Sequence, residues 1–573
     1  MGDAARLLRT RALRGFAVAA ALGALVIWYI HVGRPWLLEL GLSKHLEEAT
    51  LTTIKGVVAF LALALLVGDG LLARLKRSTT LLSRKLIPIS LAGLSAVSVG
   101  LFLASDDVGP LYYAHHWEIF HYYLGSKYHD ELGYKRIYLC AAVAQAELGP
   151  EQEAKVRART LRDLRDDSMT QASQALEDPS TCKSHFTPER WKQYRRDIGF
   201  FVNNSAQSYW EQWQNDHGYN PPPVWTTFAN LFSSNLSANR WTMRFLASID
   251  LALYTAIFYL IWWAFGARAL FAGLVFLGAQ YPGNGYFTGG AFLRQDWLFW
   301  LVASVCFARK RRYALAGGAL TFSTMLRLFP IVFFGGWAAV IAARWIRTRR
   351  LAPEHLKLIT GCAVTAVALA VWSTLVTGPH TWVDFYHHIR LHASTPLANN
   401  MGLPQLSMFA RGTAAAYGQG NDPWSLFLRH FEVFRWGLTG LLCLLFLWVA
   451  QRQPLWRAEA LGVLPVMLAA PITCYYYVFF LVTAGLARHS RVAGYLVVLC
   501  GTLSALSLVA GGRNFGASLD LGFRYVAQSV IFMGVSLGLV LCFVPWRRFR
   551  RASTSVEELE AQGAASAGGV ANG

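Results

Sequence analysis

Long apolar segments recur along the whole 573-residue chain and constrain its fold more than any other feature. Eight runs approach the ~20 residues that one helix needs to cross a bilayer: 16–29, 56–72, 86–104, 245–264, 358–376, 436–450, 492–510 and 526–544. Six shorter runs are further candidates: 269–277, 297–308, 314–325, 331–346, 461–473 and 475–486. Because 54% of the residues are hydrophobic and only 15% are charged, the chain needs lipid as its solvent. The sequence predicts an all-α polytopic membrane protein with about 12–14 crossings.

The net charge of +20 lies in short loops between these segments. Arginine and lysine cluster before the first segment and again at 74–85, 309–312, 344–350, 452–457, 488–491 and 547–551. Alternate loops are therefore basic, and the positive-inside rule places them and both termini in the cytoplasm. A nucleic-acid surface would use the same charges, but no stretch combines them with a soluble fold, so we expect no nucleic-acid partner.

The first apolar run lacks a small-residue cleavage site, so we expect an anchor and not a cleaved signal peptide. The sequence thus predicts a multi-pass protein of the inner (plasma) membrane, in contact with membrane lipids. It divides into N-terminal membrane helices 1–105, an extracytoplasmic domain 106–240, central membrane helices 241–377, a second extracytoplasmic loop 378–434, C-terminal membrane helices 435–546 and a disordered cytoplasmic tail 547–573.

We expect the extracytoplasmic domain 106–240 to be mainly helical. Its middle, 150–177, has helical spacing and predicts a surface helix. Trp191, Trp210 and Trp213 interleave with charges, which favours helices lying against lipid headgroups over a sugar-stacking surface.

Cys140 and Cys182 are the only cysteines in this domain. An oxidising compartment allows them to pair. The sequence does not give their separation, so a disulfide and two free thiols both stay open.

Histidines cluster near the start of the second extracytoplasmic loop, at His380, His387, His388 and His392. They lack the ligand spacing of a zinc site, so we expect no metal site and no bound cofactor. A need for a divalent cation stays open.

Ionisable and aromatic residues crowd the segment that follows the third apolar run. Asp106 and Asp107 stand at the outer water boundary. A carboxylate there is costly unless it is used or paired, and the alternative is an ordinary solvated turn. Four further residues follow closely: Tyr112, Tyr113, His116 and Glu118.

Four motifs, taken in order, resemble the glycosyltransferase C superfamily. They are Asp107 ahead of Tyr112 and Tyr113 with Gly125 shortly before Tyr128; Tyr219-Asn-Pro-Pro-Pro223; Arg294-Gln-Asp-Trp297 with the later Ala316-Gly and Arg327 to Pro330; and Ala470-Pro-Ile-Thr-Cys-Tyr-Tyr-Tyr477. Over most of residues 100–490 the chain is most similar to the family 87 mannosyltransferases, which use polyprenyl-phosphate mannose. Arg327 stands where that family has lysine, Gln295 lacks a preceding glycine, and Cys474 and Tyr476 stand in place of a late Trp and His.

The resemblance implies a glycosyltransferase C-like helical bundle. It implies inverting transfer of a monosaccharide, mannose in that family, from a polyprenyl-phosphate donor to an extracytoplasmic glycan or glycolipid acceptor. Asp107, with Asp106 as the alternate, would be the base, a role that typically contributes ~10²–10⁴-fold.

Arg327 is the expected contact of the donor phosphate, with Arg294 as a second one. An unpaired arginine in an apolar run is expensive, and its planar guanidinium suits phosphate. A structural ion pair is the alternative for Arg327, and Asp296 is a possible partner. The remaining expected substrate contacts are Tyr112, Tyr113, His116, Glu118, Tyr219, Gln295, Asp296, Asn400, Gln405 and Tyr476.

Two other functions stay open. A transporter or flippase for lipid-linked sugars would line a path with polar residues inside its membrane helices. Here the ionisable residues gather at one face instead. A catalytically inactive assembly subunit would keep the fold without the chemistry.

Overall fold

The computed structural model describes residues 3–40, 48–75, 85–104, 113–284, 288–394, 397, 399–408, 423–469, 471–514 and 521–545. Asp106, Asp107 and Tyr112 lie outside the described residues, as does the expected tail 547–573.

Nine helices in the described part of the chain are long and apolar enough to cross a membrane. They lie in α1 (Asp3–Trp28) with α2 (Arg34–Glu39), α3 (Glu48–Arg74), α4 (Ile87–Ala104), α15 (Arg240–Phe265), η4 (Phe329–Phe333) with α20 (Phe334–Thr348), α21 (Pro353–Thr377), α24 (Pro423–Ala450), α27 (Arg491–Asn514) and α28 (Leu521–Leu541). The chain is therefore a mainly helical, multi-pass membrane protein, as its composition predicts.

Shorter apolar helices lie between these long ones. They are α16 (Ala267–Ala279), α18 (Asp296–Arg309), α19 (Tyr313–Leu326), α25 (Leu455–Ala460), α26 (Val463–Ala469) and the 3₁₀ helix η5 (Cys474–Arg488). Helix α18 packs on α15 and α19, and α16 packs on α4 and α27. Because these segments are shorter than a bilayer needs, the finer count of 12–14 crossings stays a prediction.

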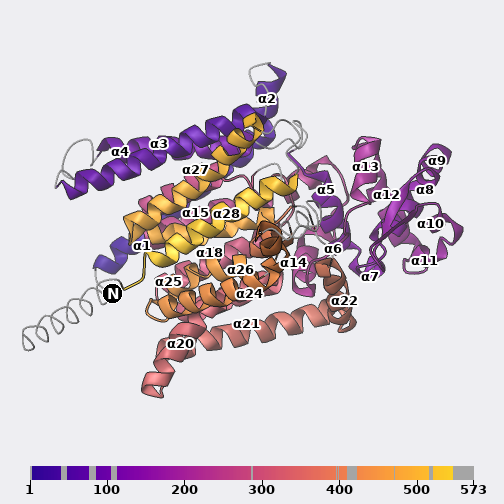
Figure 1. Cartoon of the computed structure of the whole chain (residues 1–573). Coiled ribbons are helices and arrows are strands. Elements are labelled where there is room, and N and C mark those ends of the chain that lie inside the picture. Colours follow the sequence, from indigo (N-terminus) through magenta and orange to yellow (C-terminus); the bar gives the residue numbers. More distant parts are fainter. Residues whose placement is uncertain are drawn as a thin grey trace, which may run out of the picture.

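The basic turns meet at one end of the helical bundle. Arg488 Nη1 donates to the Phe265 carbonyl at 2.9 Å, and Arg491 Nη1 donates to the Gly70 carbonyl at 3.1 Å. Lys310 Nζ lies 4.8 Å from the ring centre of Trp263. This end lies opposite the polar domain described next (Figure 1).

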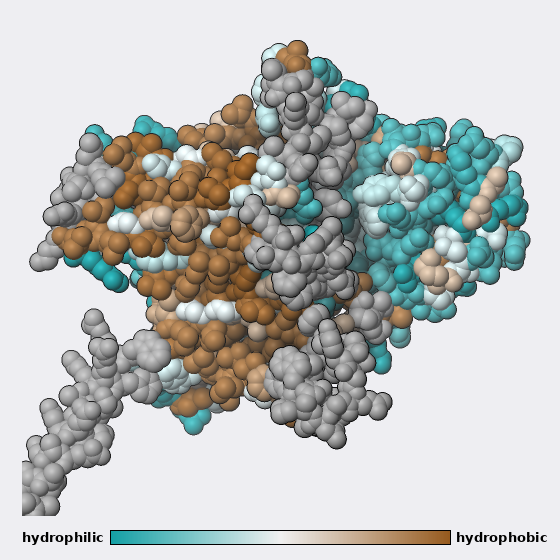
Figure 2. All heavy atoms as spheres, turned by 45° about the horizontal axis from the view of Figure 1, so that its top comes forward, coloured by the Kyte–Doolittle hydropathy of each residue, from teal (hydrophilic) through white to brown (hydrophobic). Residues whose placement is uncertain are grey.

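Residues 113–238 form the polar domain, which we call the loop domain. Figure 2 shows hydrophilic residues over this domain and hydrophobic residues over the helical bundle. Its elements are α5 (His116–Ile119), η3 (Phe120–Leu124), α6 (Gly125–Lys127), α7 (His129–Leu132), α8 (Ile137–Ala146), α9 (Pro150–Arg157), β1 (Thr160–Asp163), β2 (Ser168–Gln171), α10 (Gln174–Glu177), α11 (Ser180–Lys183), α12 (Pro188–Asn203), α13 (Gln207–Trp213) and α14 (Pro223–Ser233).

Two expectations about this domain are wrong. Trp210 and Trp213 do not lie at a lipid surface, because both are fully buried in the core of the domain, around Phe120. The segment 150–177 is not one helix, because α9 ends at Arg157 and an antiparallel pair, β1 and β2, follows. The Asp163 carboxylate accepts a hydrogen bond from the Arg165 backbone N–H at 2.9 Å, which favours a turn over helix continuation.

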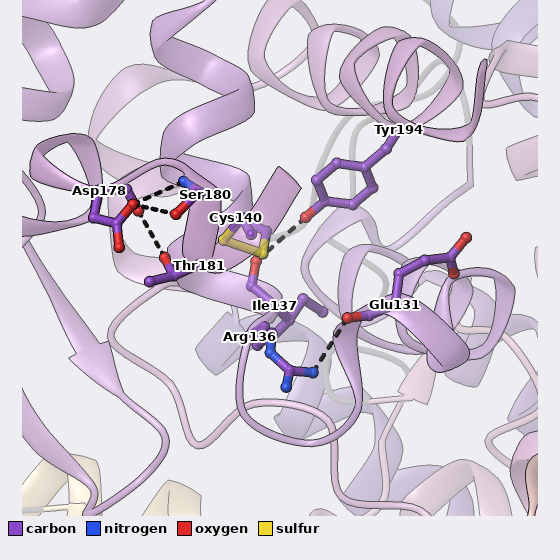
Figure 3. The surroundings of a disulfide bond; sticks show 9 residues. Glu131, Arg136, Ile137, Cys140, Asp178, Ser180, Thr181 and Tyr194 are labelled. Atoms are coloured by element: carbon purple, nitrogen blue, oxygen red, sulfur yellow. Dashed lines mark hydrogen bonds between the residues drawn. A yellow bond between two sulfur atoms is a disulfide. The ribbon is translucent and has the colours of Figure 1, made fainter. Parts of the chain in front are cut away.

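A disulfide joins Cys140 of α8 to Cys182 of α11, with 5.3 Å between their Cα atoms. Figure 3 shows that Asp178 lies beside the start of α11, where its carboxylate accepts a hydrogen bond from the Ser180 backbone N–H at 3.1 Å. The Tyr194 hydroxyl donates to the Ile137 carbonyl at 3.4 Å. The structure thus settles the pairing that the sequence left open.

Two short elements connect the second polar loop to the bundle. Strand β3 (Asn400–Met401) pairs antiparallel with β4 (Ile472–Thr473), directly before η5. Helix α22 (His380–Ser394) lies against the loop domain, where the His388 ring stacks on Tyr134 with 5.3 Å between ring centres. These contacts place the loop domain over one end of the bundle (Figure 1).

Candidate functional site

Two adjoining cavities lie where the loop domain meets the bundle. The larger one, the polar chamber, has a volume of about 910 Å³. The other, the apolar chamber, has a volume of about 660 Å³. They share five lining residues: Asn220, His392, Leu397, Thr473 and Tyr475. The two cavities therefore adjoin at these five residues, so the polar and apolar parts of one molecule have neighbouring places to bind.

The two chambers differ in their linings. The polar chamber is lined by ionisable and amide side chains, among them Glu118, His121, Tyr122, Asn204, Gln212, Asp216, His217 and Arg294. The apolar chamber is lined mainly by aliphatic and aromatic side chains, among them Phe329, Ile331, Val332, Phe385, Ile389, Val466, Ile472 and Tyr476. Leu328 and Ile331, which line it, are 52% and 60% exposed, so apolar side chains stand open at the surface of the bundle here.

Arg294 is held from both its backbone and its side chain. The Asp250 carboxylate of α15 accepts the backbone N–H groups of Arg294 and Gln295, each at 3.0 Å. Arg294 Nη1 lies 2.5 Å from a Glu118 oxygen and donates to the Tyr122 hydroxyl at 3.2 Å. Its guanidinium carbon lies 3.8 Å from the ring centre of Tyr475. These contacts fix one cation in the wall of the polar chamber.

Arg327, at the end of α19, lines the apolar chamber. Its Nη1 donates to the Leu326 carbonyl at 2.7 Å. Its Nη2 is buried and has no hydrogen-bond partner among the described residues. The guanidinium lies 5.5 Å from the ring centre of Trp225 and 5.9 Å from that of Tyr122. A buried guanidinium with an unused donor is what a bound anion would satisfy.

Arg294 and Arg327 lie in one electrostatic cluster. Asp296, Tyr476, Tyr122 and Arg294 all lie near enough to influence the charge on Arg327. No carboxylate lies within ion-pair distance of Arg327 in the described part of the chain, so the structural ion pair expected as the alternative is not seen.

Burial shifts the pKa values of the acids and histidines in the polar chamber. Burial raises the pKa of Glu118, and the nearby Arg294 and His121 lower it by less. Burial lowers the pKa of His115 to about 3, so this imidazole is neutral at ordinary pH. For Asp216 burial raises the pKa, but His121 and the 2.7 Å hydrogen bond from Trp117 Nε1 outweigh it, and the net shift is downward.

The chambers bring together six of the residues expected from the sequence: His116, Glu118, Arg294, Arg327, Asn400 and Tyr476. Asn400 is placed by the pairing of β3 with Thr473. Tyr476 packs against Trp297 and Phe329, with 5.6 and 5.2 Å between ring centres.

Five other expected contacts do not line either chamber: Tyr113, Tyr219, Gln295, Asp296 and Gln405. Tyr219 is fully buried, and its hydroxyl lies 2.7 Å from Thr226 Oγ1. Its ring occupies the place of a side chain at Gly125, where a Cβ would lie 2.2 Å from Cδ2 of the ring. Two motifs of the sequence, those of Gly125 and Tyr219, therefore pack against each other outside the chamber linings.

Asp296 and Gln295 lie at the start of α18, where hydrogen bonds to backbone N–H groups hold this turn in place. The Asp296 carboxylate accepts the Trp297 backbone N–H at 2.7 Å, and Gln295 is held by Asp250 through its backbone. Tyr113 is buried beside His31, with 6.1 Å between ring centres. Gln405 is buried in the turn that follows β3, where its backbone N–H donates to the Gly402 carbonyl at 3.1 Å.

Several residues that line the chambers or support their walls were missed by reasoning from the sequence. Asp250 carried a usable signal, because it is an acid inside the apolar run 245–264. Tyr122 and Tyr475 stand next to residues that were chosen, but nothing in the local sequence separates them from their neighbours. Asp216, His217 and His392 come from distant segments, so only the fold reveals that they meet.

The described residues contain no group of three or more His, Cys, Asp or Glu side chains arranged to hold a metal ion. Comparison of the chain with protein-family models, with curated proteins and with solved structures gives no match. The function is therefore argued from the two chambers and their arginines.

Proposed function

We propose that this chain is an integral-membrane glycosyltransferase of the glycosyltransferase C type. It transfers a monosaccharide, with mannose as the first candidate, from a polyprenyl-phosphate donor to a glycan or glycolipid. Transfer takes place on the extracytoplasmic side of the inner membrane. The observation that carries this proposal is the buried guanidinium of Arg327 in the apolar chamber, which has an unused donor and lies within electrostatic range of Arg294 in the wall of the polar chamber.

The donor's three parts match three regions of the site. The isoprenoid tail enters from the membrane past Leu328 and Ile331 and occupies the apolar chamber. The phosphate lies between Arg327 and Arg294, where charge-assisted hydrogen bonds are strong because water is largely excluded. The sugar extends past Tyr475 into the polar chamber, where the acceptor also binds.

The two arginines would supply electrostatic catalysis. When the bond between the anomeric carbon and the phosphate oxygen breaks, its electron pair goes to the phosphate, which gains negative charge. Fixed cations aimed at that oxygen stabilise the transition state more than the ground state. Asp107, with Asp106 as its alternate, stays the sequence-based expectation for the base.

The test uses the purified full chain in lipid nanodiscs with decaprenyl-phosphate [³H]mannose and a glycolipid extract as acceptor. We expect tritium to move into the acceptor, and Arg327→Gln to abolish most of that transfer. Arg344→Gln is the matched control, because Arg344 pairs with Glu354 on the exposed surface of α20. Movement of the lipid-linked sugar across vesicles without a new glycosidic bond would favour a flippase. Absence of both transfer and movement in the wild type would favour an inactive assembly subunit, and full transfer by Arg327→Gln would exclude the proposed phosphate contact.

A further inference from the structure

A carboxylate–imidazole pair lies in the loop-domain wall of the polar chamber. His217 Nδ1 is 3.0 and 3.1 Å from the two carboxylate oxygens of Asp167. The side chains are only 14% and 13% exposed. Such a bond places the proton on Nδ1 and leaves Nε2 as a proton acceptor.

The surrounding structure holds this pair in place. Asp167 lies in the turn between β1 and β2 at a φ of 67°, and its carbonyl accepts a hydrogen bond from Arg162 Nη1 at 2.7 Å. Arg162 Nε also donates to the Asn215 carbonyl at 3.0 Å, which ties the turn to the segment that carries His217. On the other side, the Gly218 backbone N–H donates to the Tyr138 hydroxyl at 2.9 Å. The orientation of the imidazole is therefore fixed by the β1–β2 turn on one side and by the Gly218–Tyr138 hydrogen bond on the other.

The second nitrogen of His217 is available to a ligand. The hydrogen bonds of the described residues include none to Nε2, and His217 lines the polar chamber, where its ring centre lies 5.5 Å from that of His392. His121 lines the same chamber but has both nitrogens engaged, with the Trp117 carbonyl and the Tyr138 hydroxyl, each at 2.7 Å. His217 thus combines a carboxylate partner on one nitrogen with a free acceptor on the other.

The position of this pair suits the side of the sugar that the acceptor must approach. In an inverting displacement the acceptor oxygen attacks from the face opposite the leaving phosphate, so its base lies away from the phosphate contacts. Glu118 is bonded to Arg294 and so lies on the leaving-group side. No hydrogen bond or ion pair joins His217 to Arg294 or Arg327 among the described residues; its carboxylate partner is Asp167.

We propose that His217, positioned by Asp167, accepts the proton of the acceptor hydroxyl. This assignment rests on the proposed function and makes His217 the base in place of Asp107, the base that the family resemblance implies. In the step, the acceptor O–H bond breaks and its proton goes to His217 Nε2. The acceptor oxygen bonds to the anomeric carbon, and the carbon–oxygen bond to phosphate breaks with its electron pair on the polyprenyl phosphate. The imidazolium then releases its proton to water.

The test measures kcat and the donor KM of the purified full chain with decaprenyl-phosphate [³H]mannose and a glycolipid extract. We expect His217→Gln to lower kcat by ~10²–10⁴-fold, the usual contribution of a positioned base, with the donor KM within about threefold of wild type. In His217→Ala, added imidazole should restore part of kcat. Asp167→Asn should lower kcat, and Asp167→Glu should recover part of it.

His185→Gln is the matched control, because His185 is an exposed histidine of the same domain. Full kcat in His217→Gln would overturn the assignment while leaving the glycosyltransferase proposal intact. A loss that imidazole does not restore in His217→Ala would also count against proton acceptance, because a packing role gives that result. Absence of transfer by the wild type would overturn the proposed function, and the role of His217 with it.

Discussion

Arg294 forms an ion pair with Glu118, whereas Arg327, close enough to Arg294 to sense its charge, has no ion-pair partner among the described residues. A buried cation without a direct ion-pair partner is expensive, and in a membrane protein such a group marks a functional site by default. This difference makes Arg327 the group whose removal should affect anion binding most.

Substitution of Arg327 tests the phosphate site. We expect Arg327→Gln to lower kcat/KM for the polyprenyl-phosphate sugar by ~10²–10³-fold, the usual effect of removing one preorganised donor. Arg327→Lys should recover part of this loss, because it keeps the charge but not the planar fork. The kinetics of transfer in nanodiscs measure both, and wild-type kinetics in Arg327→Gln would exclude a phosphate contact there.

Tyr475 supports Arg294 through its ring, which lies 3.8 Å from the guanidinium carbon. Such cation–π contacts are worth ~0.5–2 kcal/mol, so Tyr475→Ala should weaken donor binding by roughly 2- to 30-fold. Tyr475→Phe keeps the ring and is the matched control, with donor affinity near wild type. Equal losses in the two variants would show that the hydroxyl, and not the ring, is what matters.

The apolar chamber should be sensitive to the length of the donor's lipid. Ala393 lines this chamber and has an exposed side chain, so Ala393→Trp fills space without disturbing the core. We expect this variant to raise the KM for the decaprenyl-phosphate donor and to leave the KM for a donor with a ten-carbon lipid nearly unchanged. Val371→Trp, on the exposed face of α21, is the control. An equal effect on both donors would place the lipid elsewhere.

Glu118 should make stability depend on pH. Burial raises its pKa, so the folded chain holds the proton more tightly than the unfolded chain. Stability should therefore fall as pH rises from the ordinary carboxyl value near 4.3 up to the raised value, and then level off. Thermal unfolding in detergent should show this decline in the wild type and a flatter profile in Glu118→Gln. If the stability of the wild type rises with pH over this range, the charge of Arg294 outweighs burial and lowers the pKa of Glu118.

The disulfide should stabilise the loop domain. Cys140 and Cys182 enclose a sequence separation of 42 residues, for which the chain-entropy estimate is about 4 kcal/mol. Cys182→Ser should lower the unfolding temperature, and so should a reducing agent acting on the wild type but not on the variant. Cys443→Ser, a free cysteine of α24, is the control. An unchanged unfolding temperature in Cys182→Ser would show that packing alone holds α8 and α11.

The membrane architecture was largely accessible from the sequence, because hydrophobic length is a local property. Residues 245–264 and 358–376 coincide closely with α15 and α21 for this reason. The short runs 297–308 and 314–325 also match α18 and α19, to within one residue at each end. The sequence leaves open only whether these helices cross the membrane, because a buried helix inside a bundle is not limited by bilayer thickness. In the loop domain the β1–β2 turn broke an apparently helical segment through side chains such as Asp163.

The candidate site was accessible only where one residue conflicts with its local surroundings. Arg327 stands out in an apolar run and does line a chamber. Tyr219 lies in a distinctive proline-rich motif, yet the motif serves packing against Gly125. His217 and Asp167 are separated by 50 residues, and neither is unusual in its local sequence. Their relation depends on the fold of the whole domain.

A structure of the full chain in nanodiscs with decaprenyl-phosphate mannose would test the central claim most directly. Our account places the phosphate within hydrogen-bond distance of Arg327 and Arg294, the isoprenoid tail in the apolar chamber and the sugar beyond Tyr475 in the polar chamber. Donor bound at any other place on the chain, with both arginines uncontacted, would contradict it.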